Sequence, residues 1–168
     1  MLKDSALVWC FKQKRGIRLV EPNQNLTKAY LKKATGALNT MSATMQINET
    51  EWTATAAYYA RYFVLYALLM KIGAKSEIHD CTINIAQLLA NNNILQQKLI
   101  DEIEQAKQTR IDAQYYVANQ TTKTQTRRNA EKARKFVLQI EQTIENMTTE
   151  QISNIRTELS RAYEQAQR

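Results

Sequence analysis

The sequence predicts an all-α protein, an up-and-down helical bundle of about five to six helices folded as one domain. Its 168 residues include one proline, Pro22, and three glycines, so no residue from Asn23 onward lacks the donor that a helix needs. Apolar residues recur at steps of three and four along most of the chain, which is the spacing of one buried helical face. A hydrophobic content of 44% is enough for a substantial core and excludes global disorder.

Residues 1–24 are expected to form a basic arm that packs on the bundle or on a partner subunit. A short helix, a glycine stop and an alternating segment follow one another in this arm: 3–14, Gly16 and Ile17–Val20. Its large apolar side chains need cover from another surface: Leu7, Trp9 and Phe11. Glu21-Pro22 then stops the chain before the bundle begins.

The bundle is expected over 25–168, with a core over about 25–145 and an extra C-terminal helix over about 148–166. Its helices are expected over 25–46, 48–73, 76–93, 94–119, 122–147 and 148–166. Three of them begin with a capping residue that is followed three positions later by Glu or Gln: Asn48 with Glu51, Thr122 with Gln125, and Thr148 with Gln151. The last two helices are expected to form an antiparallel pair or a coiled-coil-like contact with a partner.

The helix over 48–73 is apolar around nearly its whole circumference. Two neighbouring lines of large side chains follow it: Trp52, Tyr59, Phe63, Tyr66 and Met70, and then Tyr58, Tyr62, Leu65, Leu69 and Ile72. Gly73 is expected to end the helix in the left-handed conformation. A helix with this much apolar surface belongs in the middle of a bundle or at a subunit interface, and we expect a homodimer.

Several classes of protein are disfavoured by composition. No apolar run approaches the ~20 residues that cross a bilayer, and the basic residues follow the apolar run 6–11 instead of preceding it, so we expect neither a membrane span nor a signal peptide. Cys10 and Cys81 lack CxxC spacing, which indicates neither a disulfide scaffold nor a zinc site. Gly-rich phosphate loops and paired catalytic carboxylates are absent. We therefore expect a cytoplasmic protein without a metal or a cofactor.

Positive charge is concentrated at the start of the chain. Residues 1–33 carry eight basic and two acidic side chains, so they hold +6 of the net charge of +7. A second basic cluster begins the helix over 122–147: Arg127, Arg128, Lys132, Arg134 and Lys135. Both segments suit nucleic acid or an acidic partner, although a solvated face is the more common explanation.

Arg110 is the most unusual residue of the fourth helix, because it lies on an otherwise apolar line: Leu99, Ile103, Ala106, Ala113 and Val117. A guanidinium there contacts an anion or phosphate, or it is paired with a carboxylate or backbone carbonyls. Tyr115 and Tyr116, one turn further, stack a base or pack against neighbouring helices. His79 is the only histidine and cannot anchor a metal alone, so a structural or capping role is favoured.

The residues Ala56-Ala57-Tyr58-Tyr59-Ala60-Arg61-Tyr62, followed by Ala67-Leu68-Leu69, Gly73 and Ser76-x-x-His79, resemble the signature of HEPN domains. Arg110-x-Asp112-Ala113-x-Tyr115-Tyr116, followed by 130–140, resembles the second half of that family. The resemblance covers about residues 25–145. It implies a helical bundle that commonly dimerises, and often a partner that is a minimal nucleotidyltransferase, as toxin and antitoxin.

Ribonuclease members of that family carry an arginine, four to six residues, and then a histidine. Arg110 matches the arginine, but the histidine would fall at Tyr115, Tyr116 or Val117. The resemblance therefore implies the branch without nuclease activity, a binding or accessory module for a nucleotide, RNA or a nucleotidyltransferase. Its candidate ligand contacts are Arg110, Tyr115, Tyr116, Tyr59, Arg61 and His79, and none is assigned a catalytic role. The alternatives are a ribonuclease toxin with an atypical site and a purely structural helical adaptor.

Overall fold

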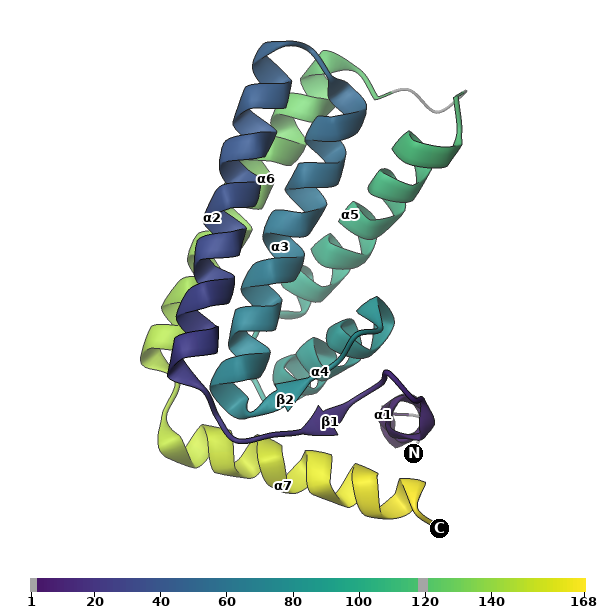
Figure 1. Ribbon diagram of the computed structural model, residues 1–168, viewed down its shortest axis with the longest axis vertical. Helices are drawn as coiled ribbons and strands as arrows, with labels where there is room; N and C mark the ends of the chain where they lie inside the picture. The colour runs from purple at the N-terminus through teal and green to yellow at the C-terminus, as the bar shows by residue number, and fades with distance from the viewer. Residues whose placement is uncertain (1–2, 118–120) are drawn as a thin grey trace.

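The computed structural model describes residues 3–117 and 121–168, which form seven helices and two short strands (Figure 1). In chain order these are α1 (Lys3–Lys12), β1 (Arg18–Leu19), α2 (Gln24–Gln46), α3 (Thr50–Ile72), β2 (Ala74–Lys75), α4 (His79–Asn91), α5 (Gln97–Tyr115), α6 (Lys123–Asn146) and α7 (Thr149–Ala166). The all-α prediction is confirmed. No described helix combines the length and the apolarity that crossing a membrane requires.

Helix α3 runs through the middle of the bundle, where α2, α5 and α6 pack around it (Figure 1). Seventeen of its 23 residues are buried, including Leu65, Leu68 and Leu69, which have no exposed surface. Burying one such leucine stabilises the fold by about 1.5–3 kcal/mol. Most of the apolar surface of α3 is therefore buried within one chain.

The ends of the helices follow the predicted capping chemistry in two of three cases. Thr122 with Gln125 and Thr148 with Gln151 form capping boxes at the start of α6 and α7, as predicted. The prediction for Asn48 is wrong. Asn48 has φ +61°, and Glu49 occupies the N-cap position of α3 instead. The three-residue link between the antiparallel α2 and α3 needs a left-handed residue, and asparagine tolerates that conformation.

Gly73 ends α3 in the left-handed conformation, with φ +77°, as predicted. A side chain from α7 completes this end. The Arg156 Nη1 atom donates hydrogen bonds to the carbonyl oxygens of Val20, Ile72 and Gly73 at 2.8, 3.0 and 3.0 Å. A cation at a helix C-terminus satisfies free carbonyls and interacts favourably with the helix dipole. Arg156 therefore joins α7 to the end of the central helix.

The N-terminal segment contacts the bundle at several points. Strand β1 pairs antiparallel with β2, with Arg18 opposite Lys75 and Leu19 opposite Ala74. Helix α1 packs against α7 and α4, and the rings of Phe11 and Tyr163 meet edge to face at 5.6 Å.

Cys10 of α1 and Cys81 of α4 form a disulfide, which the spacing of the two cysteines did not indicate. The two residues are 71 positions apart, and no sequence spacing marks such a pair. The chain reversal made by β1 and β2 lays α1 against α4 and brings the two sulfur atoms together.

Two predictions about the C-terminal half are corrected. Helix α5 spans Gln97–Tyr115 and not 94–119, so Val117, expected on the inward line, is 89% exposed, and residues 118–120 lie outside the described part. Helices α6 and α7 do not form an antiparallel pair, because α7 turns across the end of the bundle (Figure 1). The apolar face of α6 is used against α3, while α7 buries Ile155, Leu159 and Ala162 in the region of α1 and the end of α3.

Candidate functional site

An aromatic cluster with one histidine lies where the first turn of α4 meets α3. His79, the first residue of α4, has its Nδ1 atom 2.5 Å from the Tyr58 hydroxyl. Its ring stacks on Tyr62, with centroids 4.1 Å apart and planes at 16°. Tyr58 and Tyr62 are four residues apart on α3, so both rings point to the same side of that helix. His79 is thus held between two helices.

Arg110 approaches the same cluster from α5. Its guanidinium carbon lies 5.0 Å from the centroid of the Tyr58 ring and 6.0 Å from that of Tyr59, within the range of cation–π attraction. Its Nη1 atom donates a long hydrogen bond of 3.4 Å to Gln114. The Nε atom is buried and has no hydrogen-bond partner among the described residues. No described carboxylate forms an ion pair with this guanidinium.

The protonation states of the cluster follow from burial and neighbouring cations. Burial lowers the pKa of His79, and the positive charges of Arg110 and Lys107 lower it further, so the imidazole is neutral at pH 7. Burial raises the pKa of Tyr58 well above its usual range, so its hydroxyl keeps its proton. The hydroxyl can then donate to His79 Nδ1, which leaves the other ring proton on Nε2. Lys107 and Asp80 form an ion pair at the edge of the cluster.

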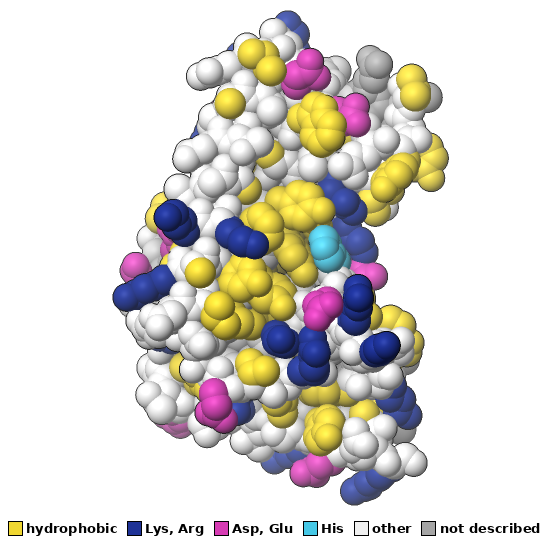
Figure 2. Space-filling model, in the orientation of Figure 1, with side chains coloured by type: hydrophobic (Ala, Val, Ile, Leu, Met, Phe, Trp, Pro, Cys, Tyr) yellow, Lys and Arg dark blue, Asp and Glu magenta, His cyan; other side chains and the backbone are white. Residues whose placement is uncertain are grey.

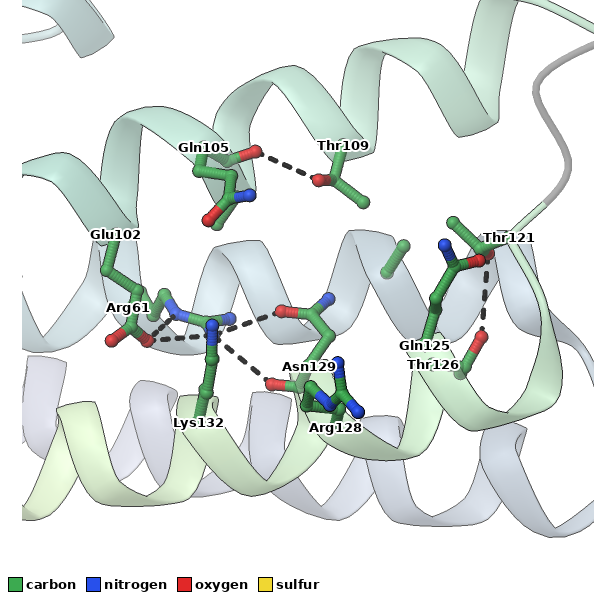
Figure 3. Close-up of a pocket in the computed structure, with 12 residues that line it drawn as sticks. Arg61, Glu102, Gln105, Thr109, Thr121, Gln125, Thr126, Arg128, Asn129 and Lys132 are labelled. Carbon is green, nitrogen blue, oxygen red and sulfur yellow. Dashed lines mark hydrogen bonds and ion pairs between the residues drawn. The ribbon is translucent and has the colours of Figure 1, made fainter.

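Arg61 contacts residues of α5 and α6 and none of this cluster (Figure 3). Its side chain is fully buried, and its Nε and Nη2 atoms both lie 2.9 Å from Glu102 Oε1. Its Nη2 atom also donates to the backbone and side-chain oxygens of Asn129 at 3.2 and 3.0 Å, and its Nη1 atom to the Ala57 carbonyl at 3.0 Å. Burial lowers the pKa of Arg61, and the Glu102 carboxylate opposes that effect. These contacts fix the guanidinium between three helices.

The structure brings together three of the six predicted contacts, namely Arg110, Tyr59 and His79. Tyr115 and Tyr116 lie at the C-terminal end of α5, where they are 73% and 56% exposed. Sequence reasoning assigned Tyr58 and Tyr62 to the core alone and did not select Lys107. The four-residue step from Tyr58 to Tyr62, on the helix followed by His79, is the signal that could have identified the two tyrosines.

A shallow apolar groove runs along α2 and α3 beside the cluster. It encloses about 450 Å³, and its large side chains are Trp52, Tyr59 and Phe63, of which Trp52 is 55% exposed. Lys33 lies over the Phe63 ring, with its Nζ atom 5.4 Å from the centroid. Figure 2 shows this face as a hydrophobic area with Lys and Arg side chains around it and the histidine at its edge. We call this surface the aromatic groove.

Comparison with known proteins gives one family match. The model of the HEPN domain matches residues 27–147, well over half of the chain. The matched segment contains α3, α4, α5, α6 and nearly all of α2, and it therefore contains every residue of the aromatic cluster. The N-terminal segment and α7 lie outside it. The search of curated proteins gave no match to this chain.

Proposed function

Because the chain belongs to the HEPN domain family, we propose that it is a binding module without catalysis of its own, in which Arg110 contacts a phosphate of RNA or of a nucleotide. The observation that carries this proposal is the buried, unpaired Nε atom of Arg110. An unsatisfied buried N–H costs about 1–3 kcal/mol, so the side chain gains when an acceptor reaches it. A phosphate accepts from the Nε and Nη atoms of one guanidinium together.

The surroundings of Arg110 support an anionic ligand. The neutral His79 offers a ring N–H without adding a negative charge, and Lys107, one turn before Arg110 on α5, balances the charge of Asp80. The Tyr59 ring lies 6.0 Å from this guanidinium and holds it by cation–π attraction. Positions 115–117 hold Tyr, Tyr and Val, so the histidine of the family's ribonuclease motif is missing as general acid or base.

Replacing Arg110 with alanine is expected to weaken the binding of labelled mixed-sequence single-stranded RNA at least tenfold, measured by fluorescence anisotropy at fixed salt. Arg161→Ala is the matched control, because it removes the same charge from an exposed position on α7 and should change the affinity less than twofold. Equal affinities for the two variants would exclude Arg110 as the contact. If neither the wild-type chain nor any variant binds RNA, the alternative of a purely structural adaptor is favoured.

A ribonuclease with an atypical site is the second candidate, favoured by the contact of Tyr58 with His79 beside Arg110. The anisotropy samples decide between the two candidates when they are also run on a denaturing gel. Intact RNA supports the binding module. RNA shortened by the protein and left intact by His79→Ala would show a nuclease.

We also propose that two copies pair through the aromatic groove, since HEPN domains commonly dimerise. Apart from its aromatic residues the groove is lined by small uncharged ones, Ala37, Thr40, Thr44, Thr55 and Ala56. A surface without charge can face its own copy without repulsion, and small side chains allow close approach.

Trp52→Glu is expected to convert a dimer into a monomer of 19.4 kDa, measured by light scattering after size exclusion. Leu138→Glu is the control, because Leu138 is 54% exposed on α6 and lies outside the groove. A wild-type chain that is monomeric, or a dimer that survives the Trp52 substitution, would contradict this interface.

A minimal nucleotidyltransferase partner, in a toxin–antitoxin or related pair, stays a prediction that co-purification from the native host checks.

The cytoplasmic location also stays a prediction. The Cys10–Cys81 disulfide opposes it, because reducing compartments keep most thiols unpaired. Cell fractionation combined with thiol labelling of the native protein distinguishes the cytoplasm from a compartment in which disulfides form.

A further inference from the structure

A second cavity opens beside a face of α5 that does not include Arg110. It lies between α5 and α6 with α3 behind it, and it encloses about 270 Å³ (Figure 3). Gln105 and Thr109 line it from α5, while Arg128, Asn129 and Lys132 line it from α6. We call it the α5–α6 cleft. Its volume lies just below the ~300–1,000 Å³ of typical small-molecule sites, which favours a small ligand.

The charges around the α5–α6 cleft do not balance. Its described lining residues include the cations of Arg61, Arg128 and Lys132 and the carboxylate of Glu102. That carboxylate is already paired with Arg61 at 2.9 Å. Arg128 and Lys132 form no ion pair or hydrogen bond with any residue in the described ranges. The cleft therefore presents two uncompensated positive charges at its mouth.

Neutral hydrogen-bonding groups face these cations across the α5–α6 cleft. The side-chain amide of Gln105 has no hydrogen-bond partner within the described part of the chain, and Figure 3 shows it on α5 opposite the α6 residues. Thr109 uses its hydroxyl proton on the Gln105 carbonyl at 2.9 Å and keeps its oxygen as an acceptor. An amide and a hydroxyl oxygen can pair with the donors and acceptors of a sugar or a base.

We propose that the α5–α6 cleft binds a phosphate monoester of mononucleotide size, with its phosphate between Arg128 and Lys132 and its neutral part toward Gln105. A phosphate monoester carries nearly two negative charges at pH 7, because its second pKa is about 6, and this matches the two unpaired cations. A monocarboxylate would leave one cation uncompensated. Arg61, held by Glu102 and Asn129, forms a rigid part of the cleft lining.

This site is separate from the proposed phosphate contact of Arg110. Glu102, Gln105 and Thr109 recur on α5 at steps of three and four and therefore share one face of that helix. Arg110 leaves the helix on the side of Tyr58 and is not among the residues that line the cleft. Loss of one site can therefore be measured without loss of the other.

The experiment titrates the full chain with AMP, GMP, CMP and UMP separately, with the parent nucleoside of each, and with inorganic phosphate, by isothermal calorimetry. Saturable binding of at least one mononucleotide is expected, with its parent nucleoside at least tenfold weaker. Lys132→Ala should weaken the mononucleotide at least tenfold. Lys135→Ala removes the same charge from an exposed position on α6 outside the cleft and should change the affinity less than twofold. Arg110→Ala is titrated alongside, because the proposed function gives this residue a phosphate contact of its own.

Three results would overturn the proposal. The first is the absence of saturable binding for all four mononucleotides and for phosphate, including the case in which only RNA binds. The second is an equal loss in Lys132→Ala and Lys135→Ala, which would show a diffuse charge effect. The third is a loss in Arg110→Ala with none in Lys132→Ala, which would place the mononucleotide in the aromatic cluster and leave the proposed function intact.

Discussion

Replacing Glu102 with alanine is expected to lower the free energy of unfolding by about 3 kcal/mol, because removing one partner of a buried ion pair leaves the other charge uncompensated. Arg61 is 1% exposed at its side chain and Glu102 is 23% exposed, so the stranded guanidinium gains little water. Its hydrogen bonds to Asn129 and Ala57 remain, which places the loss at the lower end of the range for such pairs. The measurement is urea unfolding followed by circular dichroism.

Glu104→Ala is the control for this substitution. Glu104 is an exposed acid on the same helix and has no ion pair with a described residue, so its removal should change stability by no more than about 0.5 kcal/mol. A loss for Glu102→Ala as small as that of the control would mean that the pair contributes little. Glu102→Gln keeps a hydrogen-bond acceptor for Arg61 and should lose less than the alanine variant.

Replacing Gly73 with alanine is expected to destabilise the protein by about 3 kcal/mol or more. The left-handed backbone at φ +77° is unfavourable for any residue with a Cβ atom by about 1–2 kcal/mol. The added atom would also lie 2.1 Å from Arg156 Nη1 and 2.5 Å from the Val20 carbonyl oxygen. It would therefore displace the arginine that joins α7 to the end of α3, and overpacking of this kind costs about 1–3 kcal/mol more.

Gly36→Ala is expected to change the stability of the protein in the opposite direction, so it is the control for replacing glycine with alanine. Gly36 lies within α2, and a Cβ atom there would meet no atom within 4 Å. Alanine at an open helical position is expected to stabilise the protein by about 0.5–1 kcal/mol. Thermal unfolding of the two variants side by side tests both signs, and destabilisation of equal size in both would refute the role given to the end of α3.

The predictable parts of the fold are those set by neighbours in sequence. Helix positions follow from apolar spacing, and the starts of α6 and α7 follow from Thr122 and Thr148, whose capping partners are three residues away. The turn at Asn48 was mispredicted because the same residue type caps helices and also tolerates the left-handed conformation that the α2–α3 link requires. The pairing of α7 with α6 was mispredicted, because the periodicity of a helix does not say which neighbour it covers.

The candidate site was partly predictable for the same reason. Arg110 stands out locally, since it interrupts an apolar line, and His79 stands out as the only histidine. Their meeting depends on the register between α3, α4 and α5, which no local pattern encodes. Arg61 has its acid 41 residues away, on α5. Its pairing with Glu102 was therefore not visible in the sequence.

The Cys10–Cys81 disulfide closes a covalent ring that includes β1, α2, α3 and β2. A protease that cuts the chain once between these cysteines would open the ring without releasing a fragment. The nicked protein would migrate on a denaturing gel as one species until a reductant separated it into two. The central helix and the N-terminal segment thus stay in one molecule even after the backbone between them has been broken.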